Sequence, residues 1–116
     1  MMGLRHNIAK RLEGCRLVYV TRDGDVDDRL GQVAEYFSLD VTWLPARRID
    51  GGDLDPTVQA ADYVLCPKMA MPPLTRAHLR CLCERNGKPL LCLNSPSRTC
   101  FRNAIIKLAA ALPEHP

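Results

Sequence analysis

Four short apolar runs, each followed by a turn, constrain the fold of this chain more than any other feature. They span residues 16–20, 41–44, 63–66 and 89–93. The runs do not alternate with polar residues, which is typical of strands that are covered on both faces. Helical patterns separate the runs, and strands that alternate with helices form parallel sheets with right-handed crossovers. The sequence therefore predicts an α/β fold: a three-layer Rossmann-like or flavodoxin-like sandwich with a four-stranded parallel sheet in the order 2-1-3-4.

Apolar residues at helical spacing predict the helices between the strands. At the N-terminus, Leu4, Ile8 and Leu12 share one face of a helix that Gly14 can end. The domain organisation expected is an amphipathic helix over residues 1–14 and a single α/β domain over residues 15–112.

The remaining helices follow from the same spacing, together with stop signals at proline and glycine. Pro56 is expected to open a brief helix with Asp55 as its N-cap, at the end of a long irregular loop over residues 45–56. Longer helices are expected over residues 26–37, 72–87 and 101–112.

Composition excludes several classes of protein. The chain has 116 residues and a net charge of +3, too mild for a dedicated nucleic-acid binder. No apolar run approaches the length of about 18 residues that a membrane span needs, and no secretory signal is recognisable. The six cysteines fall mostly in apolar runs or helical patterns, so reduced thiols are expected rather than disulfides. These features predict a cytoplasmic protein with no membrane partner.

The charge is unevenly distributed. Residues 1–58 carry 8 Lys or Arg against 10 Asp or Glu, a net charge of −2, whereas residues 59–116 carry 8 against 3, a net charge of +5. The second half would suit a local site for an anion, although a solvated basic helix face explains the same charge.

The candidate site lies where the carboxyl ends of the parallel strands meet, because open α/β sheets bind ligands there. The loops contain no G-x-G-x-x-G or P-loop motif, and no cofactor or metal site is predicted. Arginine, lysine and small hydroxyl side chains are expected to converge on an anionic small molecule. The residues assigned to this ligand are Thr21, Arg22, Asp23, Arg48, Lys68, Ser95, Ser97 and Arg98.

The stretch Asn94-Ser95-Pro96-Ser97-Arg98-Thr99 supports two interpretations. Ser95 before Pro96 fits an N-cap followed by the first helical position, which needs no ligand. Arg98 in the first helical turn opposes the helix dipole unless an anion accompanies it, and this favours an anion site.

A thiol enzyme is the alternative function. Cys66 ends the third strand, two residues before Lys68, and a nearby ammonium group lowers the pKa of a thiol. No histidine is placed by the sequence to activate Cys66. A non-catalytic domain that binds an anion or a protein partner, or that forms a homo-oligomer, is therefore preferred to a thiol-dependent or redox-sensing enzyme.

Several ordered blocks resemble a bacterial family catalogued as domain of unknown function 2325. The blocks are LEGCRLVYV, RIDGGDLD, ADYVLCPK and CERNGKPLLCLNSPSRTCFRNAI, and they lie between about residues 12 and 110. The similarity is carried by Asp50-Gly51-Gly52, Ala61-Asp62, Cys66-Pro67, Gly87-Lys88-Pro89 and Ser97. The resemblance implies little about activity, because the family has no settled function.

The chain departs from the pattern of that family at three places. A Gly-Gly-Arg turn after the first strand is replaced by Thr21-Arg22-Asp23. Histidines before Asp50 are replaced by Arg47-Arg48, and a Ser-His pair after the third strand by Pro72-Pro73. The resemblance implies that any serine, histidine or metal chemistry of relatives is lost in this chain.

Overall fold

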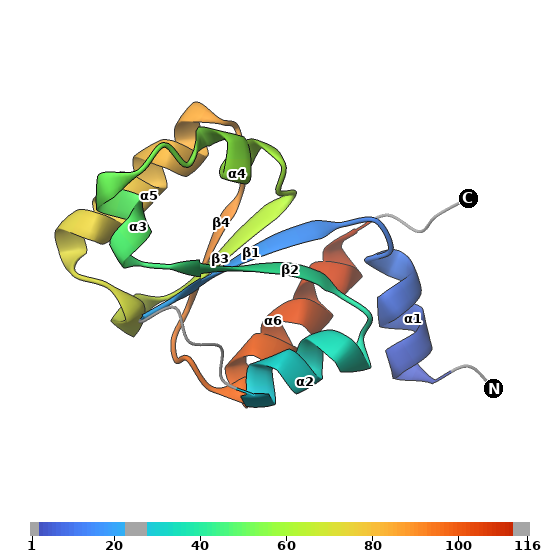
Figure 1. Cartoon of the computed structure of the whole chain (residues 1–116). Coiled ribbons are helices and arrows are strands. Elements are labelled where there is room, and N and C mark those ends of the chain that lie inside the picture. Colours follow the sequence, from blue (N-terminus) through green and yellow to red (C-terminus); the bar gives the residue numbers. More distant parts are fainter. Residues whose placement is uncertain (1–2, 23–27, 113–116) are drawn as a thin grey trace.

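A four-stranded parallel sheet forms the centre of the protein (Figure 1). The computed structural model describes residues 3–22 and 28–112. The strands are β1 (Arg16–Thr21), β2 (Asp40–Pro45), β3 (Tyr63–Pro67) and β4 (Leu90–Leu93), in the order β2-β1-β3-β4. The predicted strands, the parallel sheet and its strand order are therefore confirmed.

Strand β1 is central because it pairs with a neighbour along each edge. Tyr19 lies opposite Trp43 of β2 and opposite Leu65 of β3. Five of the six β1 residues are buried, and successive side chains enter opposite faces of the sheet. Leu17 and Tyr19 belong to one hydrophobic core and Val18 and Val20 to the other, which is why the run has no polar alternation.

Three helices cover the first face, which lies below the sheet in Figure 1. They are α1 (Leu4–Arg11), α2 (Asp28–Tyr36) and α6 (Arg98–Ala111). Phe101 of α6 is fully buried, with its ring edge-on to Tyr19 at a centroid distance of 5.1 Å. Ile8 of α1 and Leu12, its C-cap residue, belong to the same core. The helix ends at Arg11, three residues before the end expected at Gly14, which has a positive φ of 82° in the turn that follows.

Three further helices cover the opposite face: α3 (Arg47–Gly51), α4 (Asp55–Gln59) and α5 (Pro73–Arg85). A short 3-10 helix, η1 (Lys68–Ala70), precedes α5. Together the two helical layers and the sheet form the three-layer sandwich expected for a flavodoxin-like order of strands.

The prediction of an irregular loop over residues 45–56 is wrong. The segment contains α3, a helix of five residues that is anchored by buried Ile49. The prediction that Asp55 caps a helix starting at Pro56 is also wrong, because α4 begins at Asp55 with Leu54 as its N-cap. The predicted start of the second helix at Val26 lies outside the described residues.

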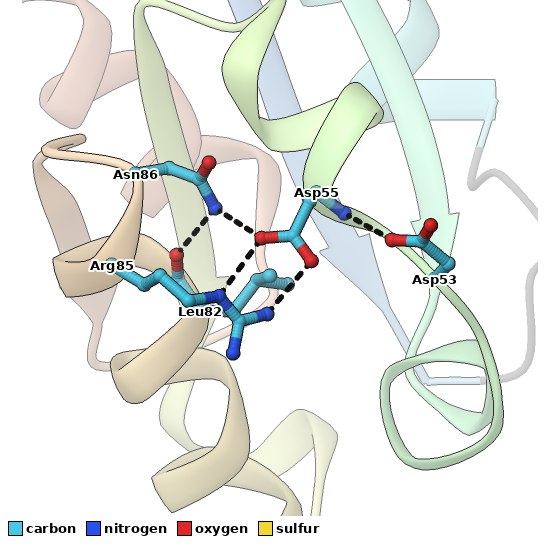
Figure 2. A network of polar contacts seen from close by, with 5 residues as sticks. All are labelled: Asp53, Asp55, Leu82, Arg85 and Asn86. Carbon is cyan, nitrogen blue, oxygen red and sulfur yellow. Dashed lines mark hydrogen bonds and ion pairs between the residues drawn. The ribbon is translucent and has the colours of Figure 1, made fainter.

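Asp55 instead joins α4 to the end of α5, as Figure 2 shows. Arg85 donates to both carboxylate oxygens of Asp55, at 2.9 and 2.8 Å. The Asn86 amide donates to Asp55 at 2.9 Å and to the carbonyl of Leu82 at 2.9 Å. The carboxylate thus holds the turn after α5 in place, where Gly87 has a positive φ of 66°.

Two of the three leucines of α5 provide a test of the core. Leu79→Ala should lower the free energy of unfolding by about 2–5 kcal/mol, because Leu79 is fully buried between α5 and the sheet. Leu74→Ala, at a position that is 67% exposed on the same helix, should change it by less than about 0.5 kcal/mol. Urea unfolding measures both, and equal effects would contradict the packing described.

Candidate functional site

The carboxyl edge of the sheet contains a topological switch point. From β1 the chain crosses to β2 on one side, whereas from β3 it crosses to β4 on the other. Connections that leave in opposite directions create a crevice between the two strand ends, and ligands of open α/β sheets bind in such crevices. Arg22 follows β1 and Lys68 follows β3.

A depression of about 570 Å³ lies at this edge, and we call it the switch-point depression. The main-chain N–H of Ala46 donates to the carbonyl of Thr21 at 2.8 Å, which extends the pairing of β1 with β2 and brings α3 beside the end of β1. The residues that line the depression come from four segments of the chain: Arg22, Ala46, Arg47, Asp50, Met69, Met71, Pro72 and Thr75.

Among the described residues, Asp50 is the acidic one that lines this depression, and two side chains of α5 bind its carboxylate. The Thr75 hydroxyl donates to one oxygen at 2.7 Å, and His78 Nδ1 lies 2.6 Å from the other. These hydrogen bonds, that of Thr75 first, lower the pKa of Asp50 below its usual 3.8. The contacts fasten α3 to α5 and hold the carboxylate in place at the depression.

The predicted cations are only partly brought together. Arg22 lines the switch-point depression, but its companion is Arg47, whereas Arg48 and Lys68 are exposed and lie outside the lining. Asp23 lies outside the described residues. Sequence reasoning did not assign Arg47, Asp50 and Thr75 to the site.

The three predicted hydroxyl residues are engaged within the fold. Thr21 is buried and donates to the carbonyl of Leu44 at 3.4 Å. Ser97, rather than Ser95, is the N-cap of α6, and its Oγ accepts from the N–H of Cys100 at 3.2 Å. Ser95 Oγ accepts from the N–H of Ser97 at 3.0 Å. The prediction of Ser95 as the N-cap is therefore wrong by two residues.

Arg98 lies in a different depression, between α2 and α6. This space of about 450 Å³, which we call the α2–α6 groove, is lined by Gln32, Val33, Tyr36, Phe37, Arg98, Thr99 and Arg102. The expected grouping of Arg98 with Arg22 in one pocket is therefore not seen, and the carboxyl edge carries two separate pairs of arginines.

Cys66 is fully buried at the end of β3. Its thiol donates a hydrogen bond to the carbonyl oxygen of Pro67, with 3.3 Å between Sγ and the oxygen. Burial, more than the neighbouring cysteines, raises the pKa of the thiol to about 12. At neutral pH the thiol therefore stays protonated, the opposite of what a nucleophilic cysteine requires.

The described part of the chain contains no cluster of metal ligands, no membrane-spanning helix and no disulfide. Within residues 3–22 and 28–112, no group of three or more His, Cys, Asp or Glu side chains is placed to hold a metal ion. None of the described helices combines the length and apolar character needed to cross a bilayer. All six cysteines are free thiols.

The fold and the site define a small α/β domain with a flavodoxin-like order of strands. No protein-family model, curated protein or solved structure matches the chain. The resemblance to domain of unknown function 2325 remains a prediction.

The Asp50 cluster gives the stability a dependence on pH. A carboxyl group whose pKa is lowered by folding stabilises the protein above its unfolded pKa, and this stability is lost as the pH falls through the folded value. Asp50→Asn should therefore lower the urea midpoint at pH 7, and its difference from the parent protein should shrink progressively below pH 3.8.

Glu84→Gln is the matched control, because Glu84 is an exposed acid on the same helix as Thr75 and His78. The Glu84→Gln variant should have nearly the same urea midpoint as the parent protein, at pH 7 and below pH 3.8. An Asp50→Asn variant with a midpoint equal to the parent at pH 7 would contradict the role given to the cluster.

Proposed function

We propose that this domain binds an anionic small molecule, bearing a phosphate or carboxylate, in the switch-point depression and without catalysing a reaction. The observation that carries the proposal is the position of Arg22 and Arg47, which come from the ends of two adjacent strands and line one depression. Arginine forks match the geometry of phosphates and carboxylates and can bind both oxygens at once.

The other lining residues support the same ligand class. Thr75 and His78 hold the Asp50 carboxylate, so the position of this side chain at the depression is fixed. Met71 and Pro72 provide apolar surface beside the arginines, and surroundings of low dielectric constant strengthen the attraction between an arginine and an anion. A volume of about 570 Å³ falls within the range of small-molecule sites.

A protein partner is the second candidate for the same edge. Met69 of η1 is 76% exposed, and Leu74 in the first turn of α5 is 67% exposed. Exposed apolar side chains beside a cationic depression suit a partner with an acidic and apolar surface.

The free thiols fit a reducing compartment, and we infer that the domain acts in the cytoplasm.

Inorganic pyrophosphate is a direct probe of the depression. Titration should raise the melting temperature of the parent protein, because a ligand that binds only the folded state stabilises it. Arg22→Ala should weaken binding by about tenfold or more, which is the cost of removing one charge-assisted contact.

Arg80→Ala is the control, because Arg80 is exposed on α5 and does not line the depression. General salt effects act equally on both variants. Equal melting increments for Arg22→Ala, Arg80→Ala and the parent would refute the proposed site.

Alkylation tests the thiol alternative. In the native protein, iodoacetamide should modify exposed Cys81 and Cys92 and spare Cys66 and Cys83, because burial holds their pKa values at about 12 and about 11. Mass spectrometry of the labelled peptides, with the urea-unfolded protein as control, measures this. Selective labelling of native Cys66 would restore the thiol-enzyme hypothesis.

A further inference from the structure

The α2–α6 groove combines an apolar floor, an aromatic wall and a cationic wall. Val33 and Phe37 form the floor and are buried, at 6% and 2% exposure. Tyr36 lines the groove, and its ring is half exposed and edge-on to Phe37 at a centroid distance of 4.9 Å. In Figure 1, α2 lies against the N-terminal half of α6.

Arg98 and Arg102 form the cationic wall on α6. They are four positions apart, so they project from the same face of the helix and repel each other. Helix α6 has no acidic residue in its first turn, and Arg98 lies near the positive end of the helix dipole. Within residues 3–22 and 28–112, neither arginine makes a hydrogen bond or ion pair.

An anion between the two guanidinium groups would remove this repulsion. Guanidinium groups bind phosphate oxygens in pairs, and the hydroxyl of Thr99, which also lines the groove, can donate a further hydrogen bond. The anion alone would leave the apolar floor and Tyr36 uncovered. A flat aromatic ring would cover them by stacking or edge contact.

We propose that the α2–α6 groove binds an aromatic compound carrying a phosphate, with the ring against Tyr36 and the phosphate between Arg98 and Arg102. The volume of about 450 Å³ is suited to a molecule the size of a mononucleotide. Among the residues that the structure describes, this groove shares no lining residue with the switch-point depression, so the two sites can be tested separately.

Adenosine 5′-monophosphate is the probe, measured by isothermal titration against two of its fragments. Adenosine lacks the phosphate and inorganic phosphate lacks the ring, so each should bind at least about tenfold more weakly. Absence of saturable binding of adenosine 5′-monophosphate would overturn the proposal. Equal affinity for inorganic phosphate would also overturn it, because Tyr36 would then have no role.

Variants locate the binding. Arg98→Ala and Arg102→Ala should each weaken binding of adenosine 5′-monophosphate by about tenfold or more. Lys107→Ala removes an exposed cation of α6 outside the groove, and Arg22→Ala removes the cation of the other site. Both should bind as the parent does. Loss of binding in Arg22→Ala, with Arg98→Ala unaffected, would assign the ligand to the switch-point depression and overturn this proposal.

The unliganded variants provide a second measurement. Because the two arginines repel each other and oppose the helix dipole, Arg98→Ala and Arg102→Ala should melt at the parent temperature or slightly above it. A clear fall in melting temperature in both variants, without ligand, would show that the arginines serve the fold and would contradict the binding role.

Discussion

The burial of β1 on both faces is the constraint on which the rest of the structure depends. Leu17 and Tyr19 enter one core and Val18 and Val20 the other, so helices must cover both sides of the sheet. With β2 on one edge of β1 and β3 on the other, the chain leaves β1 and β3 in opposite directions. The crevice at the carboxyl edge is a consequence of this topology and not of any particular side chain.

Polar contacts then shape the edge that the topology creates. The core fixes α5 through Leu79, but α3 has only five residues and one buried apolar side chain, Ile49. The hydrogen bonds of Thr75 and His78 to Asp50 supply a further attachment. They also hold in place the one carboxylate that lines the switch-point depression within the described chain.

The sequence predicts the strands, their order and the long helices, because these follow from runs and periodicities over many residues. Helix α3 was not predicted, because its five residues include only one buried apolar side chain and therefore show no apolar spacing of helical period. Without that helix, nothing indicated whether Arg47 or Arg48 would line the depression. Ser95 and Ser97 are chemically equivalent caps on either side of Pro96, and only the backbone geometry selects Ser97. The contact of Asp50 with His78 joins residues 28 positions apart and leaves no local signal.

The most direct test of the central claim, that the switch-point depression binds an anion, is a titration of the ¹⁵N-labelled protein with inorganic phosphate, followed by amide chemical shifts. The account predicts saturable shifts at Arg22, Ala46, Arg47, Met69 and Met71, which border the depression, and none at the turn around Asn86. Absence of saturable shifts at Arg22 and Arg47, or shifts confined to α2 and α6, would contradict it.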